Sequence, residues 1–346
     1  MAKHLLSALL LVILLYGCAS TAHKKTFTNS ASRNSTKNKQ SLATHFEEVD
    51  TSLFAPGDLT EGKTPVALTE LPRTTDGAFV LAPGFYEADF KTYCLQPGTP
   101  GPSSNDAYFQ ASLQGPRKEI IEDILLNSRK QSQLDQKNIQ LLLWSVVSRS
   151  QFQKLSPDVQ SAAWQLLTPK QIFELNGGVL GAARTVARVL PSSGFQSSLQ
   201  QLLDVGSSSY EAYERLAVLT TPSQISKPHM KRDQWYKQEE GYFVRYLPNN
   251  YQQTKIQVYV PEGVADSVAQ NADDYVVFDP TSMMISPANS NAQRLGVGAP
   301  VRDVVVKVID VIKTRKESQR KEPKKSPPKE TNKWKTPPMT LRATES

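Results

Sequence analysis

The clearest pattern in the chain is the helical spacing of apolar residues between positions 116 and 226. After Asp135, large apolar residues recur at intervals of three and four, which places them on one face of a helix. Ser156-Pro157 and Thr168-Pro169 each join a helix N-cap residue to a proline at the first helical position. These signals predict a helical domain of about six short helices over 116–226. The array includes segments 179–190, 199–203 and 210–219.

Residues 227–290 show the alternation that is typical of half-buried strands. Valines and tyrosines occupy every second position around Val244, and Ile256, Val258 and Val260 share one face of a second run. Further runs end at Phe278 and include residues 283–285. The pattern predicts a small antiparallel sheet that needs the helical domain to cover one of its faces.

Residues 45–115 carry short apolar pairs between proline and glycine, which interrupt any helix. Only segments 78–81 and 85–93 have the composition of strands. We therefore expect an extended segment that wraps around other parts of the protein.

The valine-rich stretch over 301–312 sets residue preference against spacing. Its valines and isoleucines favour a strand, yet they recur at helical intervals with charged residues opposite. Spacing is the stronger signal, so we predict a C-terminal helix over 299–313. Lys, Glu, Pro and Ser dominate residues 314–346, which predicts a disordered basic tail.

The first eighteen residues form a short basic start, an apolar run over 5–15 and then Leu15-Tyr16-Gly17-Cys18. The apolar run is too short to cross a hydrocarbon core, which needs about 20 residues. The stretch resembles the signal of bacterial lipoproteins, a resemblance confined to these residues. It implies that residues 1–17 are a removed signal peptide and that lipidated Cys18 becomes the mature N-terminus, anchored to a membrane.

Residues 18–44 are rich in Ser, Thr, Asn and Lys, which predicts a flexible tether between that anchor and the folded part. The expected location is the cell envelope. The residue after the lipidated cysteine is Ala19. In Gram-negative lipoproteins an aspartate at this position would imply retention in the inner membrane. In a Gram-negative host the resemblance therefore implies the outer membrane, facing the periplasm.

Together these segments predict an α+β protein of 346 residues, with basic ends and an acidic middle. Residues 313–346 hold eleven Lys or Arg and four acids, a net charge of +7, while residues 46–312 carry a net charge of −6. The charge therefore does not indicate a nucleic-acid-binding domain. The 313–346 tail is expected either to bind an anionic surface or simply to keep the chain soluble.

Catalytic chemistry finds little support in the sequence. If Cys18 carries lipid, Cys94 has no thiol to pair with, and His229 is the one histidine near the folded part. A Cys94/His229 dyad is conceivable, but Cys94 lies in an apolar run and fits a packing role better. The sequence predicts no metal site and no cofactor, since His and Cys are too few for zinc and no nucleotide-binding motif occurs.

A cluster of aromatic residues is the strongest candidate for binding. Tyrosine and tryptophan are enriched at binding hot spots, but they are also normal residues of a packed sheet. Packing is the favoured interpretation, and a binding face is the alternative. The candidates are Trp235, Tyr236, Tyr242, Tyr246 and Tyr251.

The functional hypothesis is a lipid-anchored envelope lipoprotein with a structural, assembly or binding role rather than a catalytic one, and with an envelope protein or cell-wall polymer as its partner. The alternative is an envelope enzyme that acts on glycan or peptide. Such an enzyme would use carboxylates, for example Glu239-Glu240, or the Cys94/His229 pair.

Overall fold

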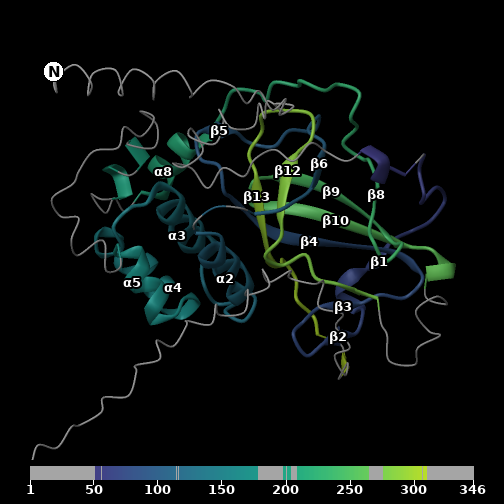
Figure 1. Cartoon of the computed structure of the whole chain (residues 1–346), viewed down its shortest axis with the longest axis horizontal. Coiled ribbons are helices and arrows are strands. Elements are labelled where there is room, and N and C mark those ends of the chain that lie inside the picture. The colour runs from purple at the N-terminus through teal and green to yellow at the C-terminus, as the bar shows by residue number, and fades with distance from the viewer. Residues whose placement is uncertain are drawn as a thin grey trace, which may run out of the picture.

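A computed structural model of the chain describes residues 51–177, 198–203, 209–264 and 276–309, apart from positions 56, 114, 116, 200 and 306. The predicted signal peptide, tether, 179–190 helix and basic tail lie outside the described residues. Within them the protein combines helices with strands, as the sequence predicted. Figure 1 shows the helices gathered on one side of the main sheet.

Within the described residues the predicted helices are present and their starts follow the cap signals, but the helix expected over 210–219 ends at Ala217, and Val218–Leu219 form a strand. The Asp135 side chain accepts a hydrogen bond from the Lys137 amide at 2.8 Å, and Thr168 and Gln171 form a capping box. Residues 198–199 and 201–203 are also helical. None of the helices in the described ranges is long and apolar enough to cross a membrane. The α-helices are α2 (Lys118–Ser128), α3 (Gln136–Ser148), α4 (Pro157–Leu166), α5 (Pro169–Leu175) and α8 (Tyr210–Ala217). Three 3₁₀ turns are η2 (Thr51–Leu53), η3 (Leu68–Glu70) and η4 (Phe152–Lys154).

The main sheet closes on itself. Its strands are β1 (Val66–Ala67), β4 (Gly84–Cys94), β6 (Tyr108–Ala111), β8 (Tyr236–Lys237), β9 (Phe243–Asn250), β10 (Gln253–Val260), β12 (Met284–Pro287) and β13 (Leu295–Pro300). Six of them run antiparallel in the order β4-β10-β9-β6-β12-β13, and β13 pairs again with β4. The result is a six-stranded barrel, with β1 and β8 attached to β4 and β9. Closure satisfies the backbone groups that an open sheet would leave at its edges.

The prediction of a small sheet is therefore wrong, because the main sheet has eight strands. The expected strands at 78–81, 85–93, 242–247 and 255–260 are present, and so are strands at Val277–Phe278 and Met284–Pro287, within or overlapping the expected runs that end at Phe278 and include 283–285. The segment expected only to wrap around the protein also supplies β4, whose eleven residues make it the longest strand. Its partner β10 pairs with it from Gln253 opposite Lys91 to Val260 opposite Gly84. Local patterns cannot reveal pairing between segments so far apart in the chain.

The predicted helix over 299–313 is also wrong within the described residues. Pro300 ends β13, and Val308–Ile309 form β14, which runs parallel to β2 (Arg73–Thr74). Together with β3 (Phe79–Val80) and β11 (Val277–Phe278) they form a four-stranded sheet in the order β11-β3-β2-β14. The β preference of valine prevailed because β2 offered a backbone partner, with the Arg73 amide donating to the Lys307 carbonyl at 2.8 Å. A last pair, β5 (Thr99–Pro100) and β7 (Val218–Leu219), is parallel.

Helix α3 is joined to the barrel by two glutamine side chains. The amide of Gln140 accepts a hydrogen bond from the Cys94 backbone at 2.8 Å and donates one to the Cys94 carbonyl at 3.0 Å. Gln136 donates to the carbonyls of Thr92 and Gln252 at 3.2 and 2.8 Å. These side chains take the place of a neighbouring strand for the end of β4, so the helices and the barrel share one core.

Candidate functional site

The five aromatic candidates are buried side chains of the fold. Their exposed fractions are 1% for Trp235, 6% for Tyr236, 5% for Tyr242, 0% for Tyr246 and 7% for Tyr251. They also belong to three separate hydrophobic clusters. The structure thus places them in packing positions and does not bring them together as an exposed face.

The contacts of Trp235 and Tyr246 explain why the sequence carries aromatic residues there. Trp235 packs edge-on against Phe85, with ring centroids 6.1 Å apart, and the Arg245 guanidinium lies 4.3 Å from its ring centroid. Tyr246 faces the barrel interior opposite Ile256, and burial raises the pKa of its hydroxyl. Large rings fill the interior of a narrow barrel, which needs volume at inward positions.

Cys94 and His229 are not brought together as a catalytic pair. Cys94 is fully buried at the end of β4, whereas His229 is an exposed residue of the loop before β8. Burial raises the pKa of the Cys94 thiol to about 12, which keeps it protonated at neutral pH. This is the environment of a packing cysteine rather than of a nucleophile.

A polar cleft of about 520 Å³ lies where the helical array meets the barrel. One wall is α2, another is the turn over 279–284, and a third is the end of β6. Its charged lining residues come in equal numbers of both signs: Lys118, Arg129 and Lys130, with Asp76, Glu122 and Asp279. Charged groups from α2, from the residues that follow it and from two turns converge in this cleft.

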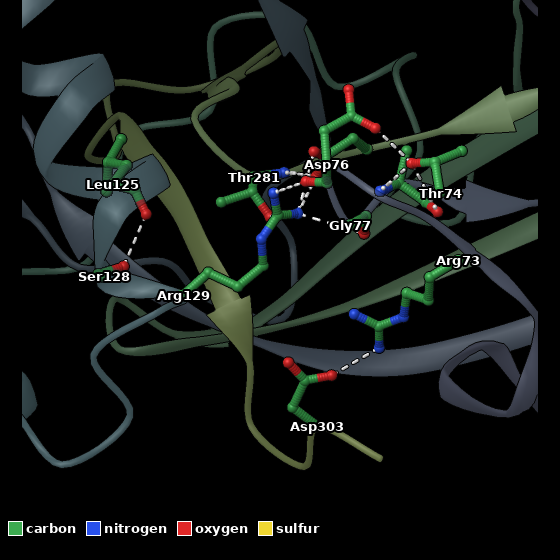
Figure 2. A network of polar contacts seen from close by, with 11 residues as sticks. Arg73, Thr74, Asp76, Gly77, Leu125, Ser128, Arg129, Thr281 and Asp303 are labelled. Carbon is green, nitrogen blue, oxygen red and sulfur yellow. Dashed lines mark hydrogen bonds and ion pairs between the residues drawn. The ribbon is translucent and has the colours of Figure 1, made fainter. Parts of the chain in front are cut away.

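Arg129, the residue after α2, is the centre of this cleft (Figure 2). Its guanidinium donates to both carboxylate oxygens of Asp279, at 3.0 and 3.2 Å, and to the Gly77 carbonyl at 3.3 Å. It also bonds the carbonyl of Asp76. The Arg129 side chain is 9% exposed, so these bonds form largely out of water. Arg129 thereby joins the helical array to the turn between β2 and β3 of the four-stranded sheet and to the 279–284 turn.

Two backbone features allow this arrangement. Gly77 has a φ of +93°, and a Cβ added there would lie 2.8 Å from Cζ of Arg129. Only glycine therefore permits the approach of the guanidinium. Ser282 has a φ of 72°, which is uncommon for a residue other than glycine, and its amide bonds the Val297 carbonyl at 2.8 Å. The turn is held in a strained conformation at the wall of the cleft.

The other two carboxylates of the cleft, Asp76 and Glu122, are also engaged, and that of Asp76 accepts a hydrogen bond from the Thr74 hydroxyl. Glu122 lies 3.5 Å from Lys118 one helical turn away, and burial raises the pKa of Glu122 above its usual value. Within the described residues, no group of three or more His, Cys, Asp or Glu is arranged to hold a metal ion.

A second surface feature lies on the helices. Trp164 of α4 and Phe173 of α5 are 57% and 52% exposed, although both residues are large and apolar. Trp164 touches the buried Phe152 edge-on, with centroids 6.0 Å apart, which fixes its orientation. We refer to Trp164 and Phe173 as the helical aromatic surface.

The sequence held a signal for part of this surface. Val159, Ala162, Ala163 and Leu166 form the buried stripe of α4, and Trp164 lies outside that stripe. A tryptophan off the buried face is a candidate for binding. No comparable signal exists for Arg129, because its partners follow from the packing of three distant segments.

Comparison with known proteins identifies no relative of this chain. Neither a protein-family model nor a curated protein nor a solved structure matches the chain.

Proposed function

We propose that the protein is a lipid-anchored component of the cell envelope that acts by binding an envelope protein or cell-wall polymer rather than by catalysis. Cys18 carries the lipid in this proposal, and the helix-capped barrel is the binding body. The observation that carries the binding role is the helical aromatic surface.

Exposed tryptophan and phenylalanine are costly to leave in water, because burying such a side chain contributes about 1.5–3 kcal/mol. Trp164 and Phe173 remain exposed on consecutive helices, which also carry exposed charged residues such as Asp158 and Lys170. An apolar centre with a charged rim is the usual anatomy of a protein interface. The polar cleft offers a second point of attachment, with charges of both signs for a polar partner.

Site-specific photo-cross-linking in cells tests this proposal. A photoreactive amino acid at position 164 or 173 of the full chain is expected to give a discrete adduct. The same amino acid at Glu61 or Glu262 serves as the control, because these two positions are exposed and lie outside the α2–α5 helices. The Cys18→Ser variant is expected to lower the adduct yield roughly tenfold, because a freed protein loses the local concentration that its anchor provides.

Adducts of equal yield from all four positions would contradict the binding role. An unchanged yield and unchanged membrane partitioning in Cys18→Ser would contradict the lipid anchor. The binding role and the lipid anchor are thus tested independently.

A further inference from the structure

A cavity of about 620 Å³ is lined by residues of β1, β4, β10 and the segment that follows β13. Its volume lies in the range of about 300–1,000 Å³ that is typical of small-ligand pockets. Thr69 and Gln253 contribute uncharged polar side chains to its lining. Two acidic and two basic residues also line it, namely Glu87, Asp89, Lys255 and Arg302.

Two of these four charges compensate each other. Lys255 Nζ lies 3.2 Å from Oε1 of Glu87, and the side-chain amide of Gln257 donates to Oε2 of Glu87 at 2.7 Å. Both carboxylate oxygens of Glu87 therefore have a partner within the fold, as does the ammonium of Lys255.

Asp89 is left without such compensation, although it lies directly opposite Lys255 in the pairing of β4 with β10. The Lys255 ammonium bonds the diagonal neighbour Glu87 instead. Oδ1 of Asp89 is buried and has no hydrogen-bond partner among the described residues, and none of their ion pairs includes Asp89. A carboxylate oxygen removed from water is costly unless a cation or donor compensates it. The wall of the cavity thus holds a carboxylate that a positively charged ligand group would stabilise.

Arg302 brings the opposite charge to the same cavity. The Val301 amide donates to the Asp89 carbonyl at 2.8 Å, which fixes the backbone next to Arg302 against β4. The Arg302 side chain is exposed, and the ion pairs of the described part of the chain do not include it. One carboxylate and one guanidinium thus remain for a ligand, and this pair is complementary to a ligand that carries one charge of each sign.

We propose that this cavity binds a short peptide with free ends, whose ammonium group meets Asp89 and whose carboxylate meets Arg302. The guanidinium suits a carboxylate because its planar fork can donate two parallel hydrogen bonds. Between the two ends, Thr69 and Gln253 offer hydrogen-bonding groups to the peptide units. This site is separate from the helical aromatic surface and from the polar cleft, and it does not depend on the function proposed for them.

The test measures the Kd of trialanine for the purified full chain by ligand-detected NMR. N-acetylated trialanine lacks the cation, and trialanine amide lacks the anion. We expect saturable binding of trialanine and roughly tenfold weaker binding of each blocked peptide, because a charge-assisted hydrogen bond is lost at one end. Free alanine has the same two charged groups without the peptide units and should also bind more weakly. Equal affinity for alanine and trialanine would overturn the assignment to a peptide.

Two variants assign the ends of the ligand to their residues. Asp89→Asn should abolish the difference between trialanine and its N-acetylated form, and Arg302→Gln should abolish the difference between trialanine and its amide. Glu61→Gln removes an exposed acid outside the cavity and should preserve both differences. Asp89→Asn should also keep the melting temperature of the parent, because its carboxylate has no ion-pair partner among the described residues to lose.

Three results would overturn the inference. The first is a parent chain that does not bind trialanine saturably, and the second is an unchanged preference for the free end in either cavity variant. The third is a clearly lower melting temperature of Asp89→Asn, which would reveal a partner of this carboxylate within the protein. These results leave the helical aromatic surface and the lipidation of Cys18 untouched, since neither involves the cavity.

Discussion

Replacing Trp144 by alanine is expected to lower the free energy of unfolding by about 4 kcal/mol, the largest effect of any single change considered for this protein. Trp144 is fully buried on α3. Its ring packs against both Tyr210 of α8 and Tyr251 of the β9–β10 turn, with centroids 5.8 and 6.5 Å away. Alanine would leave a cavity at the point where α3, α8 and the β9–β10 turn now pack against one another.

The neighbouring hydroxyls add to the expected loss. The hydroxyls of Tyr210 and Tyr251 are hydrogen-bonded at 3.0 Å, and the Tyr251 hydroxyl also donates to the Glu214 carboxylate. Burial raises the pKa of the Tyr210 hydroxyl to about 12. Urea unfolding measures the change. The control is Trp164→Ala, which removes an exposed ring and should cost less than about 1 kcal/mol. Similar losses for both variants would show that Trp144 is not the link between α3, α8 and the barrel.

Replacing Arg129 by alanine is expected to cost about 3 kcal/mol, because hydrogen bonds to charged groups contribute about 1.5–3 kcal/mol and Asp279 would keep a half-buried charge without its partner. The variant should also loosen the 279–284 turn and the Asp76–Gly77 turn, which Arg129 now joins. Amide hydrogen exchange in these two turns reports the loosening, and urea unfolding reports the free energy.

Arg129→Lys is the informative companion, because lysine keeps the charge and loses the planar fork that reaches Asp279 and Gly77 together. It should recover only part of the loss. Lys170→Ala breaks an exposed ion pair with Glu174 and should change stability by less than about 0.5 kcal/mol. Full recovery by lysine would mean that charge alone, rather than the forked geometry, matters at this position.

Local patterns in the sequence predicted much of the fold. Caps at Asp135 and Thr168 and the spacing of apolar residues located the helices, because these signals act between residues three or four apart. The alternation around Val244 and Val258 located two barrel strands for the same reason. Closure of the barrel was beyond such reasoning, since it depends on β13 meeting β4 across most of the chain.

The site was less predictable than the fold. Burial of Tyr246 and Trp235 follows from what lies on the other side of each strand, which a single strand does not encode. Arg129 follows an ordinary helix and acquires its role only where Gly77 and Asp279 meet it. Over 301–309 the helical spacing of the valines gave the wrong prediction, because the end of this segment pairs with β2 as a strand, and spacing alone does not reveal such a partner.

The most direct test of the account is a disulfide across the seam that closes the barrel. Leu295 of β13 lies directly opposite Cys94 of β4, and both side chains are fully buried. The adjacent pair is hydrogen-bonded, with the Leu95 amide donating to the Arg294 carbonyl at 2.9 Å. The Cβ atoms of directly opposed residues lie about 4.5–5.5 Å apart and are closest in pairs that do not exchange hydrogen bonds, near the separation that a disulfide requires.

The measurement is the number of free thiols after refolding in a glutathione redox buffer and denaturation, in a chain that also carries Cys18→Ser. The account predicts that Leu295→Cys has no free thiol. Met284→Cys, buried on β12 opposite Gly296 and Ala111, should keep both thiols free. Two free thiols in a folded Leu295→Cys protein, or equal disulfide formation in the two variants, would contradict the closed barrel.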